Sequence, residues 1–177
     1  MKKTFVLCLT VGLLLGTSLH TRAQGPPTDP MEVGIWIVNA GAGLNGHGYG
    51  EGVILFGFGL KAAIQQGLWQ AGPGVISLGG EAGLGLASYK GNNYSGFSIA
   101  PRSSYHYGWN VPGLDTYGGL AMGLNFISLS NHSGSNVRFY GGLYVGSSYF
   151  FTNSFAVNIE LGLGSSMQTI LGVAFRF

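Results

Sequence analysis

Three side chains that can do chemistry stand at alternate positions of one stretch: Arg102, Ser104 and His106. If that stretch is a strand, all three lie on one face, because successive strand side chains point to opposite sides. A serine beside an imidazole can act as a nucleophile with its general base, provided that a carboxylate orients the imidazole. The other histidines of the predicted mature chain, His47 and His132, are not at the spacing of metal ligands relative to His106, so the pattern predicts no metal site.

A second motif concerns nucleotide binding. Residues 41–46, Gly-Ala-Gly-Leu-Asn-Gly, match the glycine pattern of dinucleotide-binding proteins. That pattern works only where a helix follows, because the phosphates sit on the helix N-terminus. The next residues are His-Gly-Tyr-Gly, which do not predict a helix. With 33 glycines in the chain the match is accidental, and we expect no cofactor.

The first 23 residues have the pattern of a secretory signal peptide. Lys2 and Lys3 precede an apolar run at residues 5–15, which is too short to span a membrane as a helix. Thr21 and Ala23 predict cleavage before residue 24. Cys8 lies within the apolar run; a lipoprotein interpretation is the alternative, disfavoured because apolar residues continue past it. Residues 24–30 are predicted to be a lead-in and residues 31–177 one folded domain.

The composition is unusual for a soluble domain. Only 8% of residues are charged, against roughly 25% in ordinary globular proteins. After loss of the signal peptide, five basic residues face six acidic ones, a net charge of −1 that does not suggest nucleic acid as a partner. No stretch of the predicted mature chain approaches the roughly 18 apolar residues of a membrane helix. Low charge, export and two-residue periodicity together favour a membrane β-barrel.

Apolar residues alternate with small or polar ones through most of the mature chain, which predicts eight strands. The expected strands lie within residues 32–44, 54–65, 76–86, 97–107, 114–126, 137–149, 155–163 and 167–177. The expected turns and loops are residues 45–50, 66–73, 90–95, 109–113, 130–136, 151–154 and 164–166. In the first strand Val33, Ile35 and Ile37 alternate, but Trp36 and Val38 fall on the other face. Pro101 lacks an N–H, so it demands a bulge or a gap in the strand pairing.

The charged residues decide which face points inward. Those of the predicted strands fall opposite the apolar row: Lys61, Glu81, Arg102, Asp115, Arg138, Glu160 and Arg176. A soluble barrel would have the inverse pattern, with apolar residues inside. The sequence therefore predicts an all-β fold, an eight-stranded antiparallel up-and-down transmembrane β-barrel.

The leader, the eight alternating strands, the segment Tyr-Gly-Gly-Leu-Ala-Met-Gly-Leu at residues 117–124 and the terminal Phe177 resemble the small bacterial outer-membrane β-barrel family. This is the class of the OmpA transmembrane domain and OmpX. The resemblance implies an outer-membrane location with periplasmic termini and outer-membrane lipid as partner. It also implies an insertion machinery that reads Phe175 and Phe177. We expect no OmpA-type periplasmic domain, and therefore no cell-wall anchoring role.

An eight-stranded barrel is only just wide enough for its own side chains, so its inward charges should meet. Lys61, Glu81 and Arg102 lie mid-strand on consecutive strands, and Glu160 comes from the other side. We predict that these four form an ionic cluster that plugs the lumen. Near the turns at one end, Trp69, Trp109 and Tyr149, with Tyr107, Phe150 and Phe151, are predicted to form an aromatic girdle at the membrane interface.

Three classes of function follow. A structural or surface-interaction role is favoured, and no particular extracellular ligand is indicated. A lipid A-modifying enzyme, such as the outer-membrane barrel acylases and deacylases, would need His, Ser and a carboxylate at the outer rim. His106 is instead expected inside the lumen in the periplasmic half, so we predict a structural hydrogen-bonded role for it. A narrow pore is the third class, and it would need a lumen wide enough for water.

Overall fold

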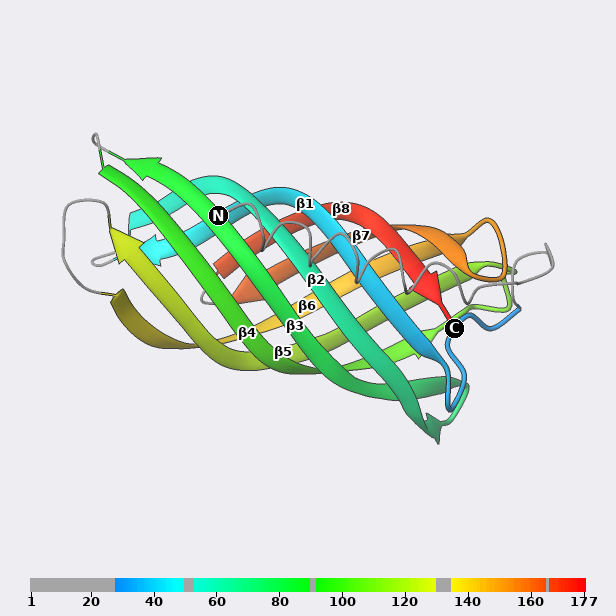
Figure 1. The fold of residues 1–177 in the computed structure, drawn as a ribbon. Helices are drawn as coiled ribbons and strands as arrows, with labels where there is room; N and C mark the ends of the chain where they lie inside the picture. The colour runs from blue at the N-terminus through cyan, green and yellow to red at the C-terminus, as the bar shows by residue number, and fades with distance from the viewer. Residues whose placement is uncertain (1–27, 50–52, 90–91, 130–134, 165) are drawn as a thin grey trace, which may run out of the picture.

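Eight antiparallel strands close into a barrel in which each strand pairs with its sequence neighbour and β1 pairs with β8 (Figure 1). The computed structural model describes residues 28–177, except 50–52, 90–91, 130–134 and 165. The predicted signal peptide therefore lies outside the described residues. The strands are β1 Trp36–Tyr49, β2 Val53–Ala71, β3 Gly74–Tyr89, β4 Asn92–Tyr107, β5 Leu114–Leu129, β6 Ser135–Phe150, β7 Phe155–Gly164 and β8 Ser166–Arg176. The predicted fold class is confirmed.

The two faces of the wall follow the alternation of the sequence. Phe58, Leu60 and Ile64 of β2 are exposed on the outside, while Lys61 and Gln65 face the lumen. The same division holds on β3, where Leu84 is outside and Glu81 is buried. The barrel is thus apolar outside and polar inside. Within the described residues, no helix is long and apolar enough to cross a membrane.

Several strands are longer than predicted. β1 starts at Trp36, four residues later than expected, but it continues to Tyr49, through the predicted turn at 45–50. β2 continues to Ala71, so that only residues 72–73 remain of the turn expected at 66–73. β4 begins at Asn92, inside the loop expected at 90–95. The strands were predicted to end where polar residues begin. Those residues mark the end of the apolar outer surface, but the backbone pairing of the strands continues beyond it.

Pro101 produces a gap rather than a bulge. The β4–β5 ladder pairs Ile99 with Leu124 and next pairs Arg102 with Ala121, with no change of register. On the other side Pro101 still pairs with Gly80 of β3. The bulge of this barrel lies elsewhere, on β2, where the register with β3 shifts between Gly67 and Trp69.

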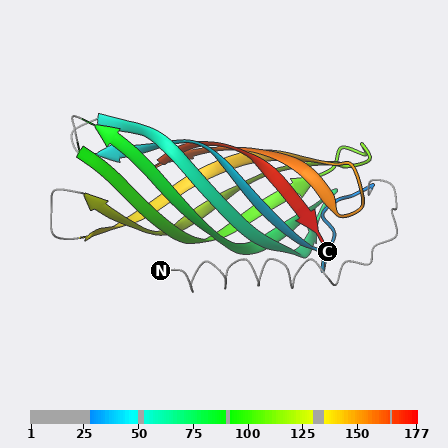
Figure 2. The same cartoon turned by 45° about the horizontal axis from the view of Figure 1, so that its top comes forward.

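The two ends of the barrel differ. One end, called here the terminal end, holds the turns at residues 72–73, 108–113 and 151–154, the C-terminus and residues 28–35 (Figures 1 and 2). The other, the loop end, holds the strand ends Tyr49, Tyr89, Leu129 and Gly164. Closure of the barrel continues to the last residue, because the backbones of Trp36 and Phe177 exchange two hydrogen bonds of 2.8 and 3.0 Å.

The β1–β8 seam depends on a glycine. A Cβ at Gly43 would overlap the carbonyl oxygen of Thr169 on β8. We expect Gly43→Ala to lower the free energy of unfolding by about 1–3 kcal/mol, the usual cost of overpacking. Gly118→Ala is the matched control, because its Cβ would meet Val145 at an ordinary 3.6 Å. Urea unfolding in lipid vesicles, followed by tryptophan fluorescence, measures both. Equal stability of the two variants would contradict the inference that β1 and β8 lie too close together at Gly43 to admit a Cβ.

Candidate functional site: an ionic cluster in the lumen

Four charged side chains from β2, β3, β4 and β7 meet inside the barrel in alternating order. Lys61 Nζ lies 2.8 Å from Glu81 Oε2 and 2.7 Å from Glu160 Oε1. Arg102 Nη1 lies 3.1 Å from Glu81 Oε2, and its Nη2 lies 2.8 Å from Glu160 Oε2. Each cation therefore contacts both carboxylates. The structure brings together all four residues expected in the lumen cluster, and the bonds from Glu160 of β7 to β2 and β4 cross the lumen.

Three tyrosines from β5 and β6 complete the cluster. Tyr140 donates a hydrogen bond of 2.7 Å to Glu81 Oε1, and Tyr117 donates one of 3.0 Å to Glu160 Oε2. Arg102 Nε donates to the hydroxyl of Tyr144 at 3.0 Å, and the guanidinium carbon lies 3.9 Å from that ring's centroid. Every carboxylate oxygen thus has a partner, which is the condition under which buried charges are tolerated. Sequence alternation places these tyrosines inward but does not identify their partners.

A small cavity of about 10 Å³ beside the ionic cluster is lined by Asn39, Lys61, Arg102, Asn158 and Glu160, among others. That volume is about what one water molecule needs. Asn39, one of these lining residues, has a buried Oδ1 without a hydrogen-bond partner. Within the described residues, no group of three or more His, Cys, Asp or Glu could hold a metal ion.

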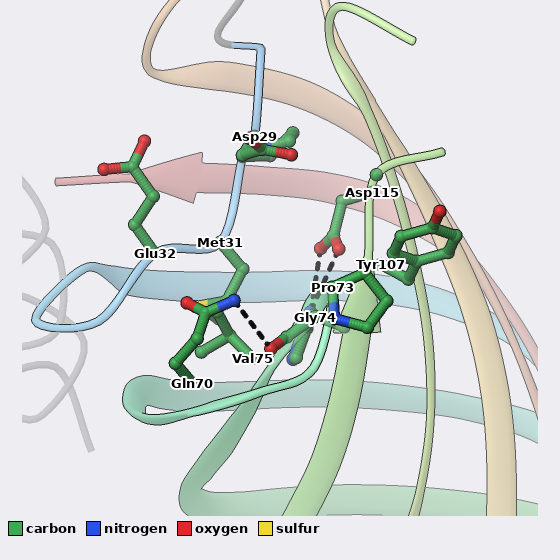
Figure 3. A pocket seen from close by; sticks show the side chains of 12 residues that line it. Asp29, Met31, Glu32, Gln70, Pro73, Gly74, Val75, Tyr107 and Asp115 are labelled. Atoms are coloured by element: carbon green, nitrogen blue, oxygen red, sulfur yellow. Dashed lines mark hydrogen bonds and ion pairs between the residues drawn. The ribbon is translucent and has the colours of Figure 1, made fainter. Parts of the chain in front are cut away.

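His106 takes partners that the sequence did not predict. Its Nε2 lies 3.0 Å from Ser77 Oγ. Its Nδ1 lies 3.0 and 3.1 Å from the two carboxylate oxygens of Asp115, a residue labelled in Figure 3. The expected neighbours, Ser104 and Arg102, instead contact the hydroxyl of Tyr144. Ser77 is on β3 and Asp115 on β5, so the three groups meet only because adjacent strands bring them to one level.

A serine that contacts a histidine, which in turn contacts an aspartate, is the arrangement of a catalytic triad: nucleophile, general base and orienting carboxylate. Ser77 is 0% exposed, however, and it also donates to Gln65 Oε1 at 3.1 Å. A cavity of about 90 Å³ at the terminal end touches His106 and Asp115 but not Ser77. Because the hydroxyl reaches no open space, the arrangement supports a structural role for His106.

The two polar groups belong to one network. Ser104 Oγ lies 2.6 Å from both the hydroxyl of Tyr144 and Oε1 of Gln65. Gln65 in turn accepts from Ser77, which contacts His106. Hydrogen bonds therefore run without a break from the ionic cluster to the terminal end of the lumen.

The aromatic residues expected in the girdle divide between the two faces. Trp69, Trp109 and Tyr149 lie outside near the terminal end, with exposed fractions of 55, 59 and 45%. Phe150 was assigned to the same girdle, and this is wrong. It is 0% exposed and points inward, because it follows Tyr149 on the strand and so has the opposite parity. Its neighbours are apolar residues that close the terminal end, described below.

The terminal strand presents its two phenylalanines outward. Phe175 is exposed, and its ring centroid lies 5.4 Å from that of Phe155 on β7. Phe177 is also exposed, while its backbone closes the barrel against Trp36. Arg176, between them, contacts the residues that precede β1.

The charge balance of the cluster yields a stability prediction. Glu81→Gln keeps the side-chain volume but leaves Lys61 and Arg102 to share Glu160 alone. We expect a loss of about 3–5 kcal/mol, as for other broken buried ion pairs. Adding Lys61→Met restores neutrality, so the double variant should lose less than the sum of the single losses, with a coupling of about 0.5–3 kcal/mol. Urea unfolding in vesicles measures all three variants. Strict additivity would contradict a coupled cluster.

No protein-family model and no curated protein matches the chain. Solved structures do. Neisserial surface protein A has a TM-score of 0.63 and 14% identity, covering 81% of this chain and 97% of its own. Ail of Yersinia pestis, in complex with the heparin analogue sucrose octasulfate, has a TM-score of 0.54 and 14% identity, and the match covers 82% of this chain and 100% of Ail. The outer membrane protein OprG of Pseudomonas aeruginosa has a TM-score of 0.50 and 12% identity, and the match covers 83% of this chain and 97% of OprG. At these identities the likeness concerns the fold, as the sequence resemblance predicted: the chain has the fold of the small eight-stranded outer-membrane β-barrels.

Proposed function

We propose that this chain is an integral outer-membrane β-barrel with a structural or surface-interaction role and a lumen closed by its own side chains. The observation that carries the proposal is the ring of Lys61, Glu81, Arg102 and Glu160, in which every carboxylate oxygen is paired inside the barrel. Charges that balance one another across the lumen hold the middle of the interior closed. A water-filled pore would leave such groups hydrated and apart.

The outer surface supports the location. Large apolar side chains cover the described outer wall, including Leu143, Leu163 and Leu171, and lipid is the solvent that such a surface fits. Trp69, Trp109 and Tyr149 at the terminal end suit a girdle at the membrane interface. Phe175 and Phe177 are proposed as the signal read by the insertion machinery, on the strength of the sequence resemblance.

The role itself is argued from what the interior offers. Ser77, the one hydroxyl placed against His106, is inaccessible, which argues against the alternative of a lipid-modifying enzyme. The paired charges that are proposed to fill the lumen argue against the alternative of a narrow pore. The surface-interaction part draws on the fold shared with Ail, an attachment invasion locus protein. No ligand is proposed for the loop end.

Planar-bilayer recording tests the closed lumen. We expect the purified protein to show no steady ion conductance, with a wide-pore porin reconstituted in parallel as the positive control. Steady conductance of the wild-type protein would overturn the proposal in favour of a pore. Lipid A from cells expressing the wild type and His106→Asn should be identical, and a difference between them would favour the enzyme.

Topology is tested by cysteine labelling of intact cells. The proposal places the terminal end in the periplasm and the loop end outside. We expect Asn92→Cys, at the loop-end start of β4, to react with a membrane-impermeant maleimide in intact cells. Pro112→Cys, in the exposed turn before β5, should react only after lysis. The reverse pattern would invert the orientation.

A further inference from the structure

The segment that precedes β1 crosses the mouth of the barrel at the terminal end. This segment, residues 28–35, is called here the N-terminal strap. Met31 is only 5% exposed, although it belongs to no strand. It packs with Ile37, Val75 and Phe150, together with two small residues of the wall, Ala156 and Ala174. Figure 3 shows Met31 beside Val75 and Gln70, with Asp29 and Glu32 on the same segment.

Arg176, the last residue of β8, holds the strap from the side. Its Nε donates to the carbonyl oxygen of Pro30 at 2.7 Å, and its Nη1 donates to Asn153 Oδ1 at 3.0 Å. A third contact, 3.4 Å from Nη2 to Glu32 Oε1, is exposed and contributes little. Pro30 itself is fully buried. One arginine therefore ties the strap to the β6–β7 turn and to the closing strand.

The strap joins the wall through the bulge of β2. Gly34 donates to the carbonyl oxygen of Gly67 at 2.8 Å, and Gly67 donates to that of Ile35 at 2.9 Å. Gly34 has a φ of 92°, a conformation that side chains other than glycine's rarely adopt. The chain thus bends sharply at Gly34, between the strap and β1.

We propose that the N-terminal strap is a hinged plug: it closes the terminal end of the lumen, and it can leave the mouth while the barrel stays folded. It is held by the apolar packing of Met31 and Ile35, the burial of Pro30, the hydrogen bonds of Arg176 and two backbone hydrogen bonds with Gly67, and none of these contacts belongs to the eight-stranded ladder. The cavity of about 90 Å³ lies between strap residues Asp29–Glu32 and the wall, so one side of the strap is incompletely packed. Contacts that lie outside the ladder and packing that is incomplete on one side are features of segments that open locally.

The proposal rests on the closed lumen of the proposed function and adds a second seal in series. The ionic cluster closes the middle of the lumen by charge pairing, and the strap closes its terminal end by apolar packing. Between them lies the hydrogen-bonded group of Ser77, His106 and Asp115. Opening of the lumen then requires that both seals be released.

Gly67→Ala is a variant aimed at the strap alone. A Cβ at Gly67 would overlap the carbonyl oxygen of Glu32 and lie 3.1 Å from Met31 Sδ. The three atoms nearest to that Cβ all belong to the strap, and Gly67 does not have a positive φ. Gly118→Ala, whose Cβ meets Val145 at 3.6 Å on the outer face, is the matched control.

Accessibility of Val75→Cys, beneath Met31, reports whether the strap is seated. We expect slow reaction with a water-soluble maleimide in the folded protein in vesicles, and reaction about tenfold faster or more when Gly67→Ala is added. Gly118→Ala should leave the rate unchanged. Met31→Cys is a second reporter on the strap itself. Circular dichroism must show the same strand content for all variants. Fast labelling without Gly67→Ala, no acceleration by it, or loss of the barrel on its addition would overturn the hinged plug.

Conductance separates this proposal from the one on which it rests. Gly67→Ala alone should remain silent, because the ionic cluster stays in place. Combined with Glu81→Ala it should conduct more often than Glu81→Ala alone, and equal conductance of the two would overturn the seal in series. Steady conductance of the wild-type protein would overturn the closed lumen, while the cysteine reporters would still decide whether the strap covers the mouth.

Discussion

Pairing of two buried carboxylates with the buried guanidinium of Arg102 and the partly buried ammonium of Lys61 is the interaction on which this barrel depends. Each of the four groups would be costly to bury alone, and they are tolerated because Lys61 and Arg102 each contact both Glu81 and Glu160. The pairing is possible only because eight strands enclose an interior just wide enough for side chains, so groups from β2 and β7 can reach each other. The width of the barrel and the charges of its lumen therefore have to match.

The interior contains different chemistry at different depths. At the terminal end Met31, Phe150 and Val75 belong to a small apolar cluster. A second cluster of buried residues lies at the level of the ionic ring and consists of Ala100, Ala121, Tyr117, Tyr140 and Tyr144. Deeper in, serine, glutamine and histidine side chains exchange hydrogen bonds, and the tyrosines and the ionic ring follow. The order follows from the side chains that each region contains: Met31 of the strap packs on apolar residues, whereas the buried polar and charged groups of the mid-lumen pair with one another.

Much of this could be predicted from the sequence, and the remainder could not for physical reasons. Alternation assigns each residue to a face, and an inward charge must find an opposite one; Lys61 and Glu160 were predicted together on that ground alone. Strand ends escaped prediction because polar residues continue a strand beyond the apolar band, as β1 does to Tyr49. The contact of His106 with Ser77 depends on the register between β3 and β4, which cannot be predicted from a local sequence pattern. Met31 was predicted to belong to the folded domain, but its position at the terminal end of the barrel was not predicted. A single apolar residue before a strand shows no periodicity from which its position could be inferred.

The ionic ring also explains why this sequence has one register. A strand that slips by one residue turns its whole inward row toward the outside. For β2, β3, β4 or β7 such a slip would move a charge of the ring into the apolar exterior and leave its partners unpaired in the lumen. Both consequences cost several kcal/mol in a membrane. Glycine-rich strands are otherwise prone to slippage, because small side chains fit either face equally well. A few buried charges thus supply the specificity that the many glycines of this chain cannot.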